Sequence, residues 1–165
     1  MKKDNHLQLK FLGTGTSSGI PVIGCDCPVC SSDDSRDKRL RCSAHIVLPD
    51  QTELLIDCGP DFRQQTLRYD IRKIDGLLIT HAHQDHIGGL DELRQINYLM
   101  REPVSIYANE ESLKEIRQRF SYIFKRTQRG GGKPKLKLKQ VSRGKEFSVN
   151  GNRILPLAIR HGQLP

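Results

Sequence analysis

The chain has 165 residues, which suits a single domain, and it carries a net charge of +8 at pH 7. No stretch approaches the roughly 20 apolar residues of a membrane-spanning helix, and residues 1–6 are polar and run straight into an alternating segment. We therefore expect a cytoplasmic protein with no secretory leader and no membrane contact. Five cysteines, an odd number, make a poor disulfide framework, which agrees with that location. The basic charge fits phosphate-bearing partners and an ordinary solvated surface equally well.

The amino-terminal part of the chain predicts strands joined by loops. Apolar and polar residues alternate over residues 7–12, which indicates a strand, and a loop rich in glycine and hydroxyl groups follows at 13–19. That loop can turn sharply and present backbone N–H groups; a P-loop is the weaker alternative, because the Gly-Lys-Ser/Thr ending is absent. A polar loop over 31–41 leads to a hairpin formed by 43–48 and 53–57.

Helices and strands alternate in the rest of the chain. The periodicity predicts, in order, a helix over 61–69, a buried strand over 76–80, a helix over 90–100, a strand over 104–108 and a helix over 111–124. A flexible basic loop near 127–135 contains three consecutive glycines, and alternating segments follow at 135–141, 146–149 and 153–159. Strands first, then strand and helix in alternation, indicate a mixed α/β layered fold.

Three of the six histidines and one aspartate lie within residues 81–86, directly after the apolar strand. On an extended segment His81 and His83 leave the backbone on the same side, and Asp85 and His86 follow where the chain turns toward a helix. Four donors in six residues exceed what one structural zinc takes from a single loop, and they suit two metal ions a few ångströms apart. The alternative is a polar surface loop that binds no metal.

The pattern His81-x-His83-x-Asp85-His86 resembles the signature of the metallo-β-lactamase-fold hydrolases. In that family the first two histidines bind one metal ion, and the aspartate and the last histidine bind the second. The resemblance therefore implies an αββα sandwich, two divalent ions (zinc or manganese) at the active site, and a catalytic role for Asp85 beside its role as a ligand.

Two further segments are similar to motifs of the same family. Residues 54–59 resemble a strand that ends in Asp-x-Gly, which implies that Asp57 supports the metal-binding loop from behind and contributes to catalysis. Residues 159–162 resemble the third motif, which implies that His161 completes the protein ligands of the first metal.

Cys25, Cys27 and Cys30 place three thiols in one short loop, where they suit a tetrahedral zinc that lacks its fourth ligand; the alternative is three unrelated thiols. Together with residues 11–21, this loop resembles the subgroup that contains the phosphoribosyl cyclic phosphodiesterase of phosphonate breakdown. That resemblance implies a structural zinc completed by a distant histidine. Cys42 and Cys58 fit neither metal site and are predicted to be buried small residues.

Members of this family continue past the third motif and supply further metal ligands there. The resemblance thus implies that residues 1–165 form one incomplete metallo-hydrolase domain, the first half to two thirds of the sandwich, with the zinc loop at 25–30. The alternatives are a fragment and a domain completed by a second chain, for example in a homodimer. For either we expect exposed core surface, and weak or absent activity of this chain alone.

The leading functional hypothesis is a metal-dependent phosphodiesterase in which a metal-bound hydroxide attacks the phosphorus of a small or cyclic phosphodiester. The alternative enzyme is a nuclease that resembles the tRNA 3′-processing ribonuclease; the lysines and arginines of 125–145 favour it and the cysteine loop disfavours it. A third alternative is a non-catalytic metal-binding or nucleic-acid-binding module, although no aromatic stacking platform is visible. A β-lactamase is disfavoured by the cysteine loop.

Overall fold

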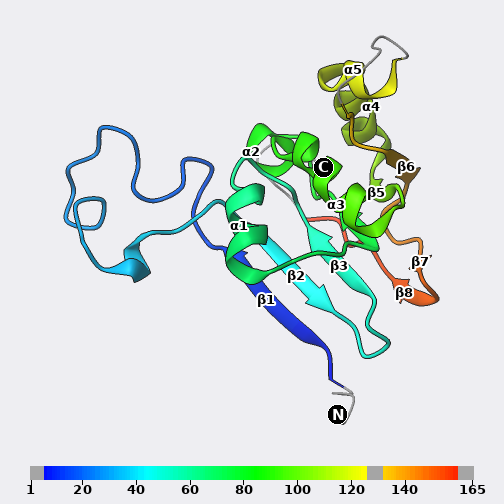
Figure 1. Ribbon diagram of the computed structural model, residues 1–165, viewed down its shortest axis with the longest axis horizontal. Coiled ribbons are helices and arrows are strands. Elements are labelled where there is room, and N and C mark those ends of the chain that lie inside the picture. The colour runs from blue at the N-terminus through cyan, green and yellow to red at the C-terminus, as the bar shows by residue number, and fades with distance from the viewer. Residues whose placement is uncertain (1–5, 126–131, 160–165) are drawn as a thin grey trace.

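A six-stranded mixed sheet forms the centre of the computed structural model, which describes residues 6–125 and 132–159 (Figure 1). Its strands, in spatial order, are β1 (Gln8–Gly13), β2 (Ser43–Val47), β3 (Glu53–Ile56), β4 (Gly76–Leu78), β5 (Val104–Ala108) and β6 (Leu136–Gln140). The first three strands pair antiparallel, and β3 to β6 pair parallel. A separate antiparallel hairpin joins β7 (Phe147–Val149) to β8 (Asn152–Ile154).

The helices follow the predicted order with small changes. They are α1 (Phe62–Tyr69), α2 (Gln84–Ile87), α3 (Leu93–Met100), α4 (Glu110–Arg119) and α5 (Ser121–Phe124), with 3₁₀ turns η1 (Ser35–Asp37) and η2 (Leu90–Glu92). The turn η1 lies within the predicted loop 31–41, and η2 begins the predicted helix 90–100. Among the described residues, no helix is long and apolar enough to cross a membrane.

Two predicted elements differ from the structure. The predicted helix over 111–124 is divided at Phe120, whose backbone leaves the helical region (φ −105°, ψ 35°), so that α4 and α5 are separate helices. The predicted strand over 153–159 ends at Ile154. Pro156 has no N–H group and cannot donate to a strand ladder, which accounts for the short strand.

Alternating side chains divide the apolar residues of the sheet between its two faces. Leu55 on β3 belongs to a large core in which the apolar faces of the helices also lie, including Phe62 of α1 and Leu93 of α3. The neighbouring Leu54 belongs to a smaller core with Val149 of the β7–β8 hairpin. Helices, central sheet and second small sheet thus form three successive layers, and this arrangement confirms the predicted α/β class.

Part of the sheet face on the hairpin side is uncovered within the described residues. Leu9 on β1 pairs with Ile46, which pairs with Leu54 of the smaller core, so all three side chains point to that face. Leu9 and Phe11 are nevertheless more than half exposed, at 51% and 62%, and Leu157 is also exposed. Within the described residues, apolar side chains on this face of the sheet are therefore exposed.

Candidate metal centre

The histidine-rich loop begins where the buried strand β4 ends. The Ile79 N–H donates to the Tyr107 carbonyl at 2.9 Å and ties the start of the loop to β5. His83 is still extended (φ −69°, ψ 153°), and its carbonyl accepts from the N–H groups of His86 and Ile87 to start α2. The chain is thus extended at His83, and α2 begins at the next residue, so that Asp85 and His86 lie in a helical turn, as the sequence predicts.

Cys58 and Gly59, which follow β3, pack directly against this loop. The Cys58 N–H donates to the His86 carbonyl at 2.7 Å, and the Gly89 N–H donates to the Cys58 carbonyl at 2.8 Å. Gly59 lies so close to the loop that a β-carbon there would be 2.0 Å from the Asp85 carbonyl oxygen. This close approach is the physical reason for a glycine in the Asp-x-Gly motif.

The loop contains two pairs of potential metal-ligand atoms, and the two atoms of each pair lie close together. His81 Nε2 lies 3.1 Å from His83 Nδ1, and His86 Nε2 lies 3.2 Å from Asp85 Oδ2. Two ligands that each lie 2.0–2.1 Å from a tetrahedral ion are about 3.3 Å apart. Both pairs therefore fit the spacing that two ligands of one metal ion require.

Asp57 holds the second pair in position. Its buried carboxylate accepts from the Thr80 N–H through Oδ1 at 2.8 Å and lies 2.7 Å from His86 Nδ1 through Oδ2. A proton on His86 Nδ1 satisfies this contact and leaves Nε2, the nitrogen beside Asp85, available to a metal ion. The Thr80 hydroxyl also donates to Asp57 Oδ2 at 2.8 Å, a contact that the sequence motif does not reveal.

Burial and neighbouring charges shift the pKa of His86 in opposite directions. Burial of the ring, the largest single effect, lowers its pKa, but the hydrogen bond and charge of Asp57 and the charge of Asp85 outweigh it. The pKa of His86 is consequently raised above its ordinary value in the metal-free chain. A metal ion must displace that proton, so its binding weakens as the pH falls.

The structure brings five of the predicted site residues together: His81, His83, Asp85, His86 and Asp57. The predicted ligand His161 lies outside the described residues, as does most of the basic loop predicted near 127–135. The described part of the chain thus contains two pairs of potential metal-ligand atoms within one loop.

A cavity of about 370 Å³ lies beside the second donor pair. It is lined by His83, Asp85 and His86 on one side and by Gly15, Thr16, Ser17 and Cys42 on the other. The prediction that Cys42 is buried is wrong, because this side chain is exposed. Partial burial and the charges of Asp57 and Asp85 raise its pKa.

The position of Cys42 follows from the direction of β2. Because β2 runs antiparallel to β3, the residue just before β2 lies beside the residue just after β3, at the edge where the metal loop is located. The predicted hairpin could have placed Cys42 beside the metal loop, but the prediction that Cys42 is buried rested on residue type alone. Cys58 is buried as predicted, and burial raises the pKa of its thiol well above the ordinary value.

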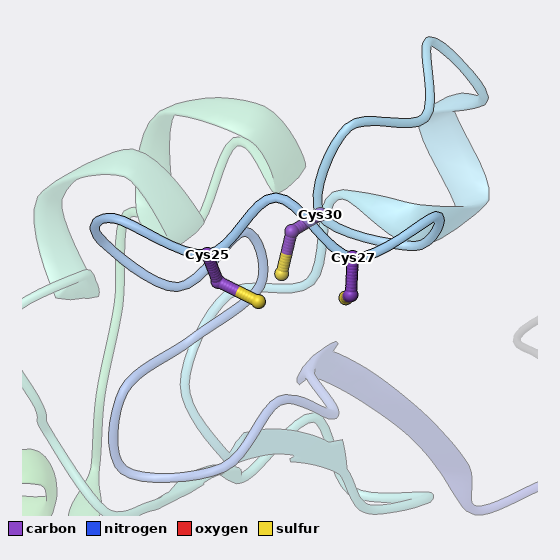
Figure 2. A group of neighbouring side chains, drawn as sticks. All are labelled: Cys25, Cys27 and Cys30. Carbon is purple, nitrogen blue, oxygen red and sulfur yellow. The ribbon is translucent and has the colours of Figure 1, made fainter.

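A second group of donors lies in the long loop between β1 and β2, which extends away from the sheet (Figure 1). The Cys25, Cys27 and Cys30 side chains converge in that loop (Figure 2), and their sulfur atoms lie within 4.8 Å of one another. A hydrogen bond from the Cys30 backbone, with weaker contributions from the other two thiols, lowers the pKa of Cys27 to about 7. Three sulfurs of one tetrahedral zinc are about 3.8 Å apart, so this cluster fits three zinc ligands.

Comparison with known proteins identifies the family. Residues 52–165 match the family described as "Beta-lactamase superfamily domain". The chain belongs to this superfamily. The crystal structure of a diphosphatase from the PhnP family is 38% identical and superposes with a TM-score of 0.85 over 96% of this chain and 60% of that one. Zinc-bound PqqB from Methylobacterium extorquens shares the fold, with a TM-score of 0.69 over 87% of this chain and 48% of that one, at 21% identity.

A curated relative is longer than this chain. A Porphyromonas gingivalis protein named octanoyltransferase is 45% identical over 155 residues, which make up 94% of this chain and 31% of that protein. This chain therefore spans about a third of that relative and 60% of the diphosphatase chain. The similarity confirms the metallo-β-lactamase fold that the motifs predict and makes a PhnP-family diphosphatase a structural neighbour of this chain.

Proposed function

We propose that this chain carries the metal-binding half of a hydrolase that cleaves small or cyclic phosphodiesters with two divalent ions, zinc or manganese. The observation that supports it best is the pair of donor contacts, 3.1 and 3.2 Å long, at one sheet edge beside a 370 Å³ cavity. The similarity to a PhnP-family diphosphatase, at 38% identity, supports phosphorus chemistry over lactam hydrolysis.

Each side chain then has a defined role. His81 and His83 hold one ion, to which the sequence motif adds His161, and Asp85 and His86 hold the other. When bound, such ions activate water and neutralise the phosphate oxygens in the transition state. Asp57 orients His86 through its 2.7 Å contact and accepts the Nδ1 proton, so that Nε2 is the ring nitrogen that a metal ion would bind.

The size of the cavity supports a small substrate. Small-molecule sites typically occupy about 300–1,000 Å³, and this cavity of about 370 Å³ falls at the lower end of that range. The diphosphatase similarity makes a phosphoanhydride the second candidate substrate class. A nuclease remains the alternative enzyme, and precursor tRNA is its test substrate.

We further propose that Cys25, Cys27 and Cys30 bind one zinc ion that is structural and separate from the reaction centre. Thiolate ligands select zinc over hard cations such as magnesium and manganese. The lowered pKa of Cys27 helps to supply a thiolate near neutral pH.

Metal content tests the active-site assignment directly. His83→Ala and Asp85→Ala should each lower the number of metal ions per chain in elemental analysis, while the control His6→Ala, at an exposed histidine far from the loop in sequence, should not. Unchanged metal content in both loop variants would contradict the assignment.

Activity is tested separately, with the chain alone and with the chain extended at its carboxyl end by the corresponding part of the PhnP-family diphosphatase. We expect turnover of a cyclic phosphodiester by the extended chain in the presence of manganese or zinc, and weak or no turnover by the chain alone. Rapid cleavage of precursor tRNA without turnover of small diesters would favour the nuclease.

A further inference from the structure

The glycine-hydroxyl loop after β1 forms the wall of the cavity that faces the metal-binding loop. Gly15, Thr16 and Ser17 line the 370 Å³ cavity together with Asp85 and His86. These two segments are about 70 residues apart in the sequence, and the sequence motifs did not place Gly15, Thr16 and Ser17 at the site. Whatever occupies the cavity next to the predicted ions also contacts this loop.

Hydrogen bonds and close backbone contacts hold this loop in place. The Gly15 N–H donates to the Leu40 carbonyl at 2.8 Å, and a β-carbon at Gly15 would lie 2.7 Å from the Arg39 carbonyl oxygen. Arg41 Nε donates to the Ser17 carbonyl at 2.8 Å, while its Nη1 lies 2.8 Å from Asp61 Oδ1. The backbone of this wall is therefore held by contacts within the chain.

At Thr16 and Ser17 these contacts use the backbone carbonyls as acceptors and do not use the N–H or hydroxyl groups. The Thr16 carbonyl accepts from the Gly19 N–H at 2.9 Å, and the Ser17 carbonyl accepts from Arg41. Thr16 and Ser17 are exposed residues, and within the described part of the chain their backbone N–H and hydroxyl groups have no hydrogen bond. Clustered donors of this kind, with few competing acceptors, form an anion-binding surface.

We propose that Thr16 and Ser17 bind the phosphate group of the substrate, with their hydroxyls donating to its non-bridging oxygens, across the cavity from Asp85 and His86. This inference rests on the proposed function and identifies the residues that recognise a tetrahedral phosphorus oxyanion. In the metal-free chain the carboxylate of Asp85 also faces the cavity and repels an anion. Phosphate binding therefore requires the metal-loaded chain.

Inorganic phosphate is the probe, titrated into the manganese-loaded chain in a calorimeter. Thr16→Val and Ser17→Ala should each weaken phosphate binding about tenfold, the effect of one hydrogen bond to a charged group. The matched control is Ser18→Ala, which removes an exposed hydroxyl from the next residue, outside the lining of the cavity. All three variants should retain the metal content of the parent chain.

The exposed thiol of Cys42 provides a second readout, because it lines the same cavity. Phosphate should slow its alkylation in the parent chain and in Ser18→Ala, as measured by peptide mass spectrometry, and should slow it less in Thr16→Val at the same phosphate concentration. No phosphate binding by the metal-loaded parent, or equal binding by all three variants, would refute the proposal. Loop-dependent phosphate binding without hydrolysis of any phosphodiester by the extended chain would instead refute the proposed function and leave the phosphate site standing.

Discussion

Replacing Asp57 by asparagine changes one oxygen of a buried carboxylate into an NH₂ group. The remaining oxygen keeps the hydrogen bond from the Thr80 N–H, so the NH₂ group faces His86 Nδ1. Two donors cannot face one another, so His86 must move its proton to Nε2, the nitrogen that lies 3.2 Å from Asp85 Oδ2. The substitution thus blocks a metal ligand without removing any ligand residue.

The expected magnitudes follow from the burial of the pair. The side chains of His86 and Asp57 are only 16% and 4% exposed, so solvent screens their hydrogen bond weakly. A hydrogen bond to a charged group contributes about 1.5–3 kcal/mol, and loss of about 2 kcal/mol lowers the melting temperature of a chain of this length by about 4–8 °C. Removing a carboxylate that orients a metal-binding histidine costs about 10–100-fold in metal affinity.

Two measurements test this reasoning: thermal unfolding of the metal-free chain, and a competition titration with a chelator for the metal-loaded chain. Asp70→Asn is the matched control, because Asp70 is exposed, pairs with the exposed Arg72 and has a left-handed backbone that asparagine tolerates. If Asp57→Asn melts like this control and binds metal as tightly, Asp57 does not hold the site together.

Three further predictions concern the thiols, the pH and the glycine of the loop. Zinc should protect Cys25, Cys27 and Cys30 from alkylation. In the zinc-free chain the pH dependence of the alkylation rate at Cys27 should follow a pKa of about 7. Unhindered alkylation of the three thiols with zinc present would contradict the structural zinc site. Because the folded pKa of His86 is raised, its contribution to the stability of the metal-free chain is complete below pH about 6.5 and is lost as the pH rises through the folded pKa. The difference in unfolding free energy between the parent and His86→Gln should therefore shrink at high pH, and a constant difference in denaturant titrations would exclude this linkage. Gly59→Ala should cost about 2 kcal/mol or more in the same titrations, because its β-carbon meets the Asp85 carbonyl, whereas Gly76→Ala meets only side chains and should cost less.

The periodicity of apolar residues along the sequence predicted much of the secondary structure. The strand at Val104–Ala108 and the hairpin strands β2 and β3 match their predicted ranges within one or two residues, because period-two alternation is a property of neighbouring residues. The order of ligand types in the metal loop is also local: His81 and His83 lie two positions apart, and Asp85 and His86 are adjacent, whereas Asp57 then fixes the orientation of His86 from a distant strand end. The convergence of Cys25, Cys27 and Cys30 has the same origin, because one short loop contains all three.

The tertiary structure alone decided which remote segments meet at the site. The antiparallel pairing of β2 with β3 brings Cys42 to the cavity, and the bridges to residues 39–41 hold the Gly15–Ser17 loop opposite His86. These contacts depend on strand order and register, which involve residues tens of positions apart and leave no trace in a short window of sequence. The sequence by itself therefore determined the candidate metal ligands, which lie in one local motif. The shape of the cavity beside them depends on the pairing of distant strands, so only the tertiary structure decided it.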